Sequence, residues 1–331
     1  MIKKIFQQKI LSWFKQHGRI LPWRIKTHPN APALHVRDQS IASYFTKTWK
    51  RDPYKVAVSE LMLQQTQVER VIPKFEAFIG RWPTIQDLAK AKLSDVVVAW
   101  QGLGYNRRAR FLHEMAKTVV EKHGGSFPKK ESELRTLPGI GEYTSRAILT
   151  FAYGEDVGVI DTNIRRIFAR VYMGVEAHIA SNDTKSAQKL LKLVDDTVPK
   201  GKGDPWNQAL MDFGATICVS PSPKCKECPL QDICTANVYA QKQGLIYSEF
   251  LLTQKKLIGK KTALQPFHKT NRYFRGRIVD FLRNGTSHME DLRLHLEKNH
   301  GLSDRATFGT IVERLVLDKL IVIRGSNVSL D

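Results

Sequence analysis

The chain has 331 residues, and its 52 lysines and arginines exceed its 32 aspartates and glutamates, giving a formal net charge of +20. Hydrophobic residues make up 42% of it and charged residues 25%, a globular composition that excludes wholesale disorder. No stretch approaches roughly 18 consecutive apolar residues, which excludes a membrane-spanning helix. The polar residues 7–9 interrupt the apolar start, so we expect no signal peptide and a cytoplasmic location.

The apolar pattern is helical over most of the chain. Residues 4–17 predict an amphipathic helix that ends at Gly18, whereas residues 25–51 lack the pattern and predict a loop or insertion. From residue 54 to about 240, apolar residues recur at helical spacing, and no segment alternates as a half-buried strand does. We therefore expect this region to be all-α. A polar, lysine-bearing stretch over 241–270 predicts a linker.

A glutamate interrupts an apolar segment near residue 60. Glu60 stands within VAVSELML, residues 56–63, where its neighbours predict burial. Glutamate is seldom buried unless it is paired, and removal from water raises the pKa of a carboxyl group. Glu60 is therefore a candidate for a side chain that carries a proton near neutral pH.

Two glycines surround a predicted tight turn at Leu137-Pro138-Gly139-Ile140-Gly141, between two helical stretches. Glycine allows such a turn, and N–H groups at the start of the following helix can bind a phosphate. The same glycines would equally suit an ordinary turn between two helices that binds no phosphate. Further on, Asp161 lies where an apolar segment becomes a helix, a position that suits either an N-cap or a functional carboxylate.

All four cysteines fall within 17 residues, at Cys218, Cys225, Cys228 and Cys234. A secreted disulfide scaffold would spread its cysteines through the chain, so this cluster predicts one four-thiolate metal site. Zinc sites usually have two Cys-x-x-Cys pairs, and here only Cys225 and Cys228 form one. We favour a 4Fe–4S cluster that stabilises a loop, with zinc as the alternative.

The last 60 or so residues have a different pattern. It predicts three short helices and a β-hairpin, over 275–284, 289–299, 305–319 and 320–330. Three helices and a hairpin resemble a winged-helix module, an α+β fold that binds DNA or proteins. The charge of +20 favours a polyanionic partner, and nucleic acid is the commonest one.

Five segments occur in the order found in the helix-hairpin-helix DNA glycosylases. They are ELMLQQTQ (60–67), Gly102-Leu103-Gly104-Tyr105, the turn at 137–141, Val159–Arg166 and the cysteine cluster. Within that superfamily they resemble the adenine DNA glycosylase (MutY) family most closely. The resemblance covers residues 1–24 and 52–240.

The resemblance implies an all-α body of two domains with the active site in the cleft between them. A six-helix barrel with the helix-hairpin-helix would span 52–165, and 1–24 with 166–240 would carry the iron–sulfur cluster. Residues 25–51 would be an insertion, 241–270 a linker and 271–331 the winged-helix-like domain. We expect a monomer that binds double-stranded DNA with a mispaired or damaged base.

The resemblance also assigns roles to single residues. Glu60 would protonate the leaving adenine, and Asp161, with Asn163 against it, would stabilise the positive charge that develops on the sugar. Tyr143 stands where relatives that cut the strand carry a lysine, which implies a monofunctional enzyme. The remaining residues would bind the substrate: Trp23, Arg24 and Gln208 at the adenine, Gln65 and Tyr105 as wedges in the base stack, and Leu137, Gly139 and Gly141 at the phosphates.

Two departures from the family affect specificity. Arg24 and Asp52 are separated by 27 residues where relatives have only a few, and the C-terminal region does not resemble the family's Nudix-like domain. The winged-helix-like module could instead contact phosphates through Arg272, Arg275 and Arg277. The expected activity is hydrolysis of adenine paired with 8-oxoguanine or guanine. A thymine or uracil mismatch glycosylase and a non-catalytic DNA-binding regulator are the alternatives.

Overall fold

The computed structural model describes residues 2–25, 51–174, 184–257 and 265–331. The chain forms two compact units that alternate along the sequence. Unit 1 comprises residues 1–56, 129–131 and 141–261, and unit 2 comprises 57–128, 132–140 and 262–331. The predicted insertion at 25–51 lies outside the described residues except at its ends. None of the described helices is long and apolar enough to cross a membrane.

All the regular secondary structure of unit 1 is helical in the parts that the structure describes. Its helices are α1 (Ile2–His17), α8 (Glu142–Phe151), α9 (Thr162–Phe168), α10 (Thr184–Thr197), α11 (Gly203–Thr216), α12 (Thr235–Gln241) and α13 (Tyr247–Leu257), with short turns η1 (Pro22–Arg24), η4 (Ala169–Met173) and η5 (Cys225–Glu227). Helix α1 begins two residues before its predicted start and ends at the predicted Gly18.

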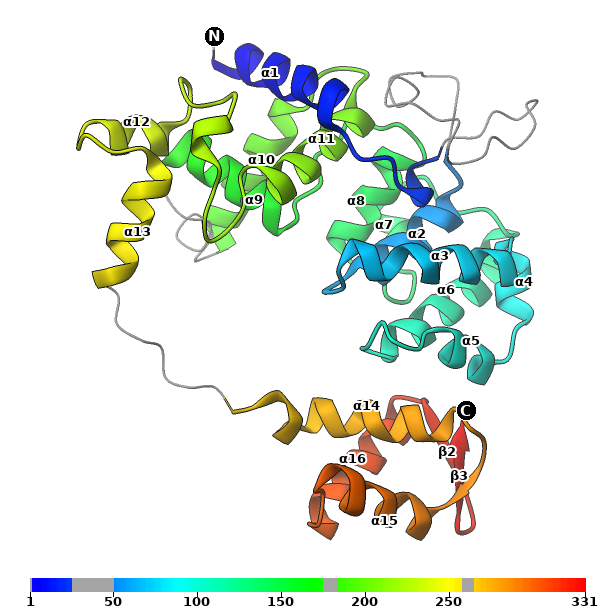
Figure 1. The fold of residues 1–331 in the computed structure, drawn as a ribbon. Helices are drawn as coiled ribbons and strands as arrows, with labels where there is room; N and C mark the ends of the chain where they lie inside the picture. Colours follow the sequence, from blue (N-terminus) through cyan, green and yellow to red (C-terminus); the bar gives the residue numbers. More distant parts are fainter. Residues whose placement is uncertain (1, 26–50, 175–183, 258–264) are drawn as a thin grey trace. The chain divides into compact units, whose positions relative to one another are not determined.

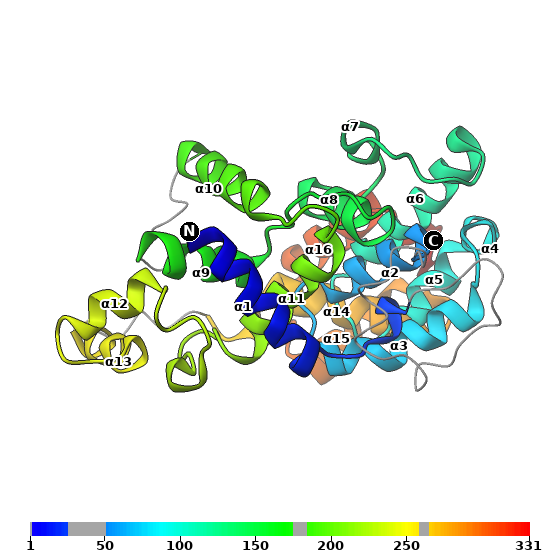
Figure 2. The same cartoon turned by 90° about the horizontal axis from the view of Figure 1, so that it is seen from above.

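The core of unit 1 forms where α1 packs along α11, side by side in both views (Figures 1 and 2). Phe6, Ile10 and Phe14 recur every four residues on one face of α1 and are fully buried. The Phe6 ring meets Trp206 of α11 edge to face, with ring centroids 5.3 Å apart. This spacing is the helical stripe that the sequence predicts.

Helix α13 occupies part of the stretch that the sequence predicts as a linker. Tyr247 and Leu251, one turn apart, are buried against Ala236 and Ala240 of α12. Two apolar side chains four residues apart are enough to hold a short helix on its neighbour. Because the surrounding sequence is polar and rich in lysine, the apolar spacing of this pair did not predict a helix here.

Unit 2 contains most of the predicted barrel and the predicted C-terminal module. Its helices are α2 (Pro53–Leu63, in unit 2 from Ala57 onward), α3 (Val68–Arg81), α4 (Ile85–Lys90), α5 (Leu93–Ala99), α6 (Arg107–His123), α7 (Glu131–Leu134, mostly in unit 2), α14 (Asn271–Leu282), α15 (Met289–His300) and α16 (Arg305–Leu317), with a short turn η6 (Phe267–Lys269). Helix α6 packs against α4 and α5. Helix α2 is buried on nearly all sides, as its apolar sequence predicts.

The C-terminal helices α14, α15 and α16 accompany a small antiparallel sheet in the order β1-β3-β2. Its strands are β1 (Ser287–His288), β2 (Ile321–Arg324) and β3 (Asn327–Leu330). The three predicted helices and the hairpin are confirmed. Helix α14 begins at Asn271, earlier than predicted, because the Thr270 hydroxyl accepts the Tyr273 N–H and caps it. The two-residue β1 is too short to be visible in the sequence.

Candidate active site

Asp161 is held at the N-terminus of α9 in unit 1. Its Oδ1 accepts the Ile164 N–H at 2.7 Å, and its Oδ2 accepts from the Asn163 side-chain amide at 3.1 Å. The guanidinium of Arg166 donates to Asn163 Oδ1 at 2.7 Å and fixes that amide in turn. Asp161 is thus the N-cap of α9 and also a carboxylate held in a fixed orientation. The two roles that its sequence position suits, N-cap and functional carboxylate, are therefore compatible.

The environment of this carboxylate acts on its pKa in two directions. Burial raises the pKa of Asp161 above its ordinary value, while the hydrogen bonds from Ile164 and Asn163 and the charge of Arg166 act to lower it. The hydrogen bonds therefore oppose protonation of a carboxylate that is partly removed from water.

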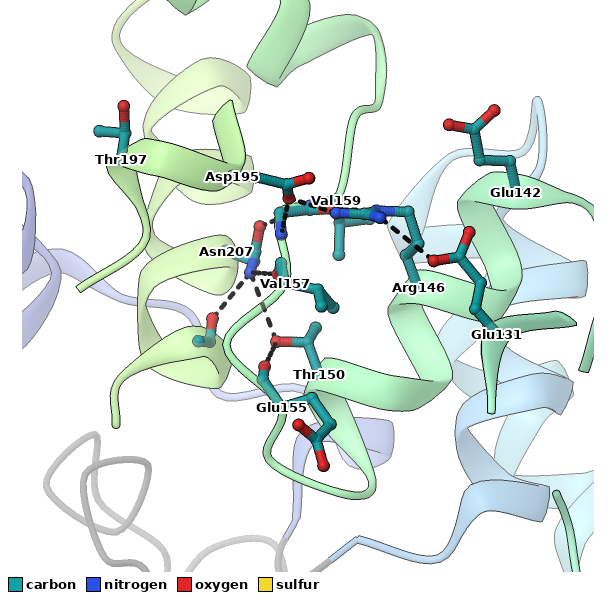
Figure 3. Close-up of polar contacts among 12 residues, drawn as sticks. Glu131, Glu142, Arg146, Thr150, Glu155, Val157, Val159, Asp195, Thr197 and Asn207 are labelled. Carbon is teal, nitrogen blue, oxygen red and sulfur yellow. Dashed lines mark hydrogen bonds and ion pairs between the residues drawn. The ribbon is translucent and has the colours of Figure 1, made fainter. Parts of the chain in front are cut away.

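The chain that leads into Asp161 is an extended segment, 157–159, bound by side chains from three helices (Figure 3). Asn207 of α11 accepts the Val159 N–H at 2.9 Å and donates to the Val157 carbonyl at 3.0 Å. Asp195 of α10 accepts the Gly158 N–H at 2.8 Å, and Arg146 of α8 donates to the Gly158 carbonyl at 2.6 Å. Side chains thus replace the strand partner that this extended backbone lacks.

Close packing also fixes this region. A Cβ at Gly158 would lie 2.5 Å from a Val194 methyl group and 3.0 Å from an Asp195 oxygen. A Cβ at Gly214 of α11 would lie 2.5 Å from the Cβ of Asn163. Both positions require glycine so that α10 and α11 can approach the segment and α9.

Glu60 lies on α2 in unit 2 and is 7% exposed. Its neighbours along the helix, Val58, Leu61 and Met62, are each at most 1% exposed. The predicted burial is confirmed. The Glu60 side chain is therefore largely removed from bulk water.

Gln65 and Tyr105 lie together in unit 2, where the tyrosine hydroxyl donates to the glutamine side-chain carbonyl. Both adopt left-handed backbone conformations, with φ of 57° and 47°. Residues other than glycine rarely adopt this conformation, because it costs of order 1 kcal/mol or more. Two adjacent strained residues are typical of a functional site.

Arg108 of α6 holds both strained loops and was not singled out in the sequence. Its guanidinium donates to the carbonyls of Gln64 at 2.7 Å and Leu103 at 2.9 Å, and to that of Leu61. Burial lowers the pKa of Arg108 to about 10, so it remains charged at neutral pH. Only the fold shows this role, because the carbonyls that it binds have no signature in the sequence.

Trp23, Arg24 and Gln208 are all buried in unit 1, at 7%, 3% and 4% exposure. Arg24 forms a two-pronged ion pair with the fully buried Asp212 of α11, at 2.8 and 2.9 Å. Burial alone would raise the pKa of Asp212, but the charge and hydrogen bonds of Arg24 and Arg19 lower it. Asp212 is a second residue that the sequence did not reveal.

The predicted turn at 137–141 forms as expected. The Ile140 N–H donates to the Leu137 carbonyl at 3.1 Å, and Gly139 has a φ of 76°. A Cβ on Gly139 would lie 2.8 Å from the Phe111 Cβ, so both the backbone and the packing require glycine. Gly141 is exposed and precedes α8, whose second residue, Tyr143, is half-buried.

The four cysteines are free thiols and line one small cavity in unit 1, next to Arg170 and Tyr247. Burial raises the pKa of Cys228 to about 12 and that of Cys234 to about 11, so positive charge is needed to form the thiolates. Arg170 supplies some, donating to the Cys218 sulfur at 3.5 Å. The donor set suits a four-thiolate centre. Within the described residues, however, no three His, Cys, Asp or Glu side chains are arranged to hold a metal ion.

A groove of about 1250 Å³ lies within unit 2. Gln65 and Tyr105 line it together with α14 and the end of α16. Eight arginines contribute to its walls: Arg70, Arg107, Arg108, Arg272, Arg275, Arg277, Arg283 and Arg314. A groove so rich in guanidinium groups suits a polyanion.

Comparisons with known proteins identify the family of the chain. The family described as "HhH-GPD superfamily base excision DNA repair protein" matches residues 58–195. The human "Adenine DNA glycosylase" is 38% identical over 244 residues, which cover 73% of this chain but only 41% of the human one. The "Adenine DNA glycosylase" of Mycolicibacterium smegmatis is 34% identical over 314 residues, covering 95% of this chain and 91% of that one.

A solved structure titled "Structure of a thermostable thymine-DNA glycosylase" superimposes with a TM-score of 0.59 and 28% identity. The match covers 71% of this chain and 96% of that one. The fold is thus a mostly helical one of the HhH-GPD type. Because the Mycolicibacterium relative matches over nearly its whole length, the chain belongs to the adenine DNA glycosylase family.

Proposed function

We propose that the protein is a monofunctional DNA glycosylase that hydrolyses the N-glycosidic bond of adenine paired with 8-oxoguanine or guanine. The observation that carries the proposal is the pair of carboxyl groups in unlike surroundings. Glu60 is buried in the largely apolar helix α2, and Asp161 accepts two hydrogen bonds at the start of α9. Two such environments separate a proton donor from an anion.

The base must first leave the duplex, because an enzyme cannot reach its glycosidic bond inside the stack. Gln65 and Tyr105 would fill the vacated space as wedges. The turn at 137–141 would bind phosphates through its N–H groups. Trp23, Arg24 and Gln208 would line the adenine pocket, where the ion pair with Asp212 leaves Arg24 little freedom to move.

Glu60 would then donate its proton to a ring nitrogen of adenine. The bond from the sugar carbon to the base breaks, its electron pair leaves with the neutral base, and positive charge develops on the sugar. The Asp161 carboxylate would stabilise that charge. A water molecule would then add to the sugar and lose a proton to solvent, and the Glu60 carboxylate would take up a proton to restore the enzyme. Tyr143 offers no amine for a Schiff base, so the DNA strand should stay intact.

Cys218, Cys225, Cys228 and Cys234 would hold a 4Fe–4S cluster, with zinc as the alternative. Its contribution would be structural, connecting η5 to the start of α12. Four half-buried thiols around one cavity and the neighbouring Arg170 support this proposal. We also propose that residues 271–331 act as a winged-helix-like DNA-binding module, supported by the three helices, the sheet and the arginine-rich groove.

One panel of duplexes tests the proposal. It contains adenine opposite 8-oxoguanine, adenine opposite guanine, and thymine or uracil opposite guanine, each scored for strand breaks with and without hot alkali. We expect adenine to be released and breaks to require alkali. Glu60→Gln and Asp161→Asn should each slow release about 100-fold or more while DNA binding persists. Glu121→Gln, the same change on the exposed side of α6, should leave release unchanged.

Other outcomes are equally clear. Release of thymine or uracil, with adenine untouched, would favour the mismatch glycosylase, to which the 28% identical thymine-DNA glycosylase structure lends some weight. Breaks without alkali would contradict the monofunctional assignment. Binding without release of any base would favour a non-catalytic regulator.

A further inference from the structure

Helix α8 holds the chain that leads into Asp161 at two points (Figure 3). The Arg146 guanidinium donates through Nε to the Gly158 carbonyl at 2.6 Å. One turn further along the helix, the Thr150 hydroxyl donates to the Glu155 carbonyl at 2.9 Å. Both contacts come from one face of α8, because residues four apart lie one above the other on a helix. The position of this chain segment is therefore tied to that of α8.

Arg146 and Asp195 together bind both backbone polar groups of Gly158. Asp195 of α10 accepts the Gly158 N–H at 2.8 Å, and the same carboxylate oxygen accepts from the Arg146 guanidinium. A residue of a neighbouring β-strand would offer one acceptor and one donor in the same way. The ion pair thus fixes both the position and the direction of the backbone at Gly158, three residues before Asp161.

The burial of Arg146 indicates a requirement for geometry. The residue is 7% exposed, and its charge is balanced by two carboxylates, those of Asp195 and, at 3.2 Å, Glu131. A buried ion pair adds little net stability over apolar residues of the same volume, because removal from water offsets most of the attraction. An arginine adds direction instead, since its planar fork binds a carbonyl and two carboxylates at fixed angles.

The N-terminus of the same helix would contact DNA. Helix α8 begins at Glu142, directly after the turn at 137–141 that is proposed above to bind phosphates. Arg146 lies one turn further along the helix. Helix α8 would thus touch the DNA backbone at its start and hold the approach to Asp161 from its middle.

We propose that Arg146 is a positioning residue for base release: through Gly158 it sets the place of the Asp161 carboxylate relative to the phosphate-binding end of α8. This inference rests on the proposed function, in which Asp161 stabilises the charge on the sugar. A phosphate bound at the start of α8 and a carboxylate held through Arg146 share one rigid helix. Binding of the DNA backbone then places the sugar against the carboxylate, and a small displacement of either slows the reaction strongly.

The test separates the rate of release from the affinity for DNA. Arg146→Met keeps the approximate length of the side chain and removes its donors and its charge. We expect single-turnover release of adenine opposite guanine to slow about 10-fold or more. The dissociation constant of the same duplex with uncleavable 2′-fluoro-2′-deoxyadenosine should change less than about 2-fold, because Arg146 does not itself contact DNA. Arg81→Met, the same change at a half-exposed ion pair with Asp95, should leave both values unchanged.

Two further measurements distinguish positioning from a role in packing alone. The hydrogen bonds from Ile164 and Asn163 oppose the rise that burial causes in the pKa of Asp161. We expect Arg146→Met to weaken these bonds, which raises that pKa further and moves the acidic limb of the pH–rate profile to higher pH. Arg146→Lys, which retains the charge but not the planar fork, should restore part of the lost rate.

A second variant covers the case in which Arg146→Met does not fold. The side chain of Asp195 is 37% exposed, so Asp195→Ala should leave the protein folded. It removes the partner that holds both Arg146 and the Gly158 N–H, and it should slow release at unchanged affinity for DNA.

Release at the wild-type rate by Arg146→Met, or by Asp195→Ala where the first variant does not fold, would overturn the proposal. So would slower release with an equal loss of DNA affinity, or with an unmoved acidic limb, since either result indicates packing alone. Failure of the proposed function is distinguishable from these results. If the wild type releases no base, the proposed function fails and this inference with it. If it releases thymine instead of adenine, only the substrate is wrong, and the same comparison on thymine tests Arg146.

Discussion

Asn207 offers the sharpest test of how the fold positions Asp161. This fully buried side chain binds both ends of the segment 157–159, which leads directly into the N-cap of α9. Asn207→Ala removes one acceptor and one donor without touching Asp161 itself. We expect it to lower both the stability of the protein and the rate of base release.

The stability loss follows from the backbone groups left behind. Val159 is completely buried, so its N–H would lose the hydrogen bond to Asn207 at a cost of about 1–3 kcal/mol. Val157 is half-buried, and its carbonyl can recover a bond to water, so that loss is about 1 kcal/mol. Together they predict a decrease of about 2–4 kcal/mol in the free energy of unfolding.

Urea unfolding would measure this decrease, and single-turnover release of adenine by the folded variant would measure its effect on the site. We expect release to slow at least tenfold, because small displacements of a catalytic group have large effects on rate. Thr197→Val is the control: this buried hydroxyl donates to the Leu193 carbonyl at 2.6 Å and does not contact the segment. A loss below about 0.5 kcal/mol, or a release rate equal to that of Thr197→Val, would refute the reasoning.

Further predictions concern other buried groups. Burial raises the pKa of Asp161 in the folded state, so the ionised carboxylate destabilises the fold increasingly as the pH rises above the ordinary pKa of 3.8. Asp161→Asn should therefore raise the melting temperature at pH 7 but not at pH 3. A lower melting temperature of the variant at pH 7 would contradict this. Asp212→Ala should cost about 3–5 kcal/mol in urea unfolding, since it leaves Arg24 charged and buried, and Asp232→Ala, at an exposed pair, should cost less than 1 kcal/mol. Cys228→Ser should remove most of the iron and visible absorbance from the purified protein, whereas equal iron in both would exclude the cluster.

Local features of this fold could be predicted from the sequence. The apolar spacing of Ile5, Ile10, Leu11 and Phe14 predicted an amphipathic helix, and the apolar neighbours of Glu60 predicted its burial. In the structure Phe6 takes the buried position in place of the half-buried Ile5. The glycines of the segment 137–141 predicted a tight turn, and at Gly139 neither the backbone nor the packing accommodates another residue. In each case the residues that decide the structure lie within a few positions of one another.

Long-range pairs could not be predicted in the same way. Asp212 and Arg24 are 188 residues apart, and Asn207 is 48 residues from Val159. A buried asparagine or aspartate looks like any polar residue on a helix until its partner is known. The sequence therefore did not identify the residues that support the candidate site, although it did identify the residues to which we assign its chemistry.

Arg108 illustrates the physical cost of that support. The strained conformations of Gln65 and Tyr105 persist only because another group stabilises the loops that carry them. Arg108 does so with hydrogen bonds to several carbonyls, but it must be buried as a cation, which lowers its pKa. Two strained backbone positions, a buried guanidinium and the nearby charge of Arg272 are each unfavourable for stability. Their coincidence in one groove supports the proposal that unit 2 contacts DNA there.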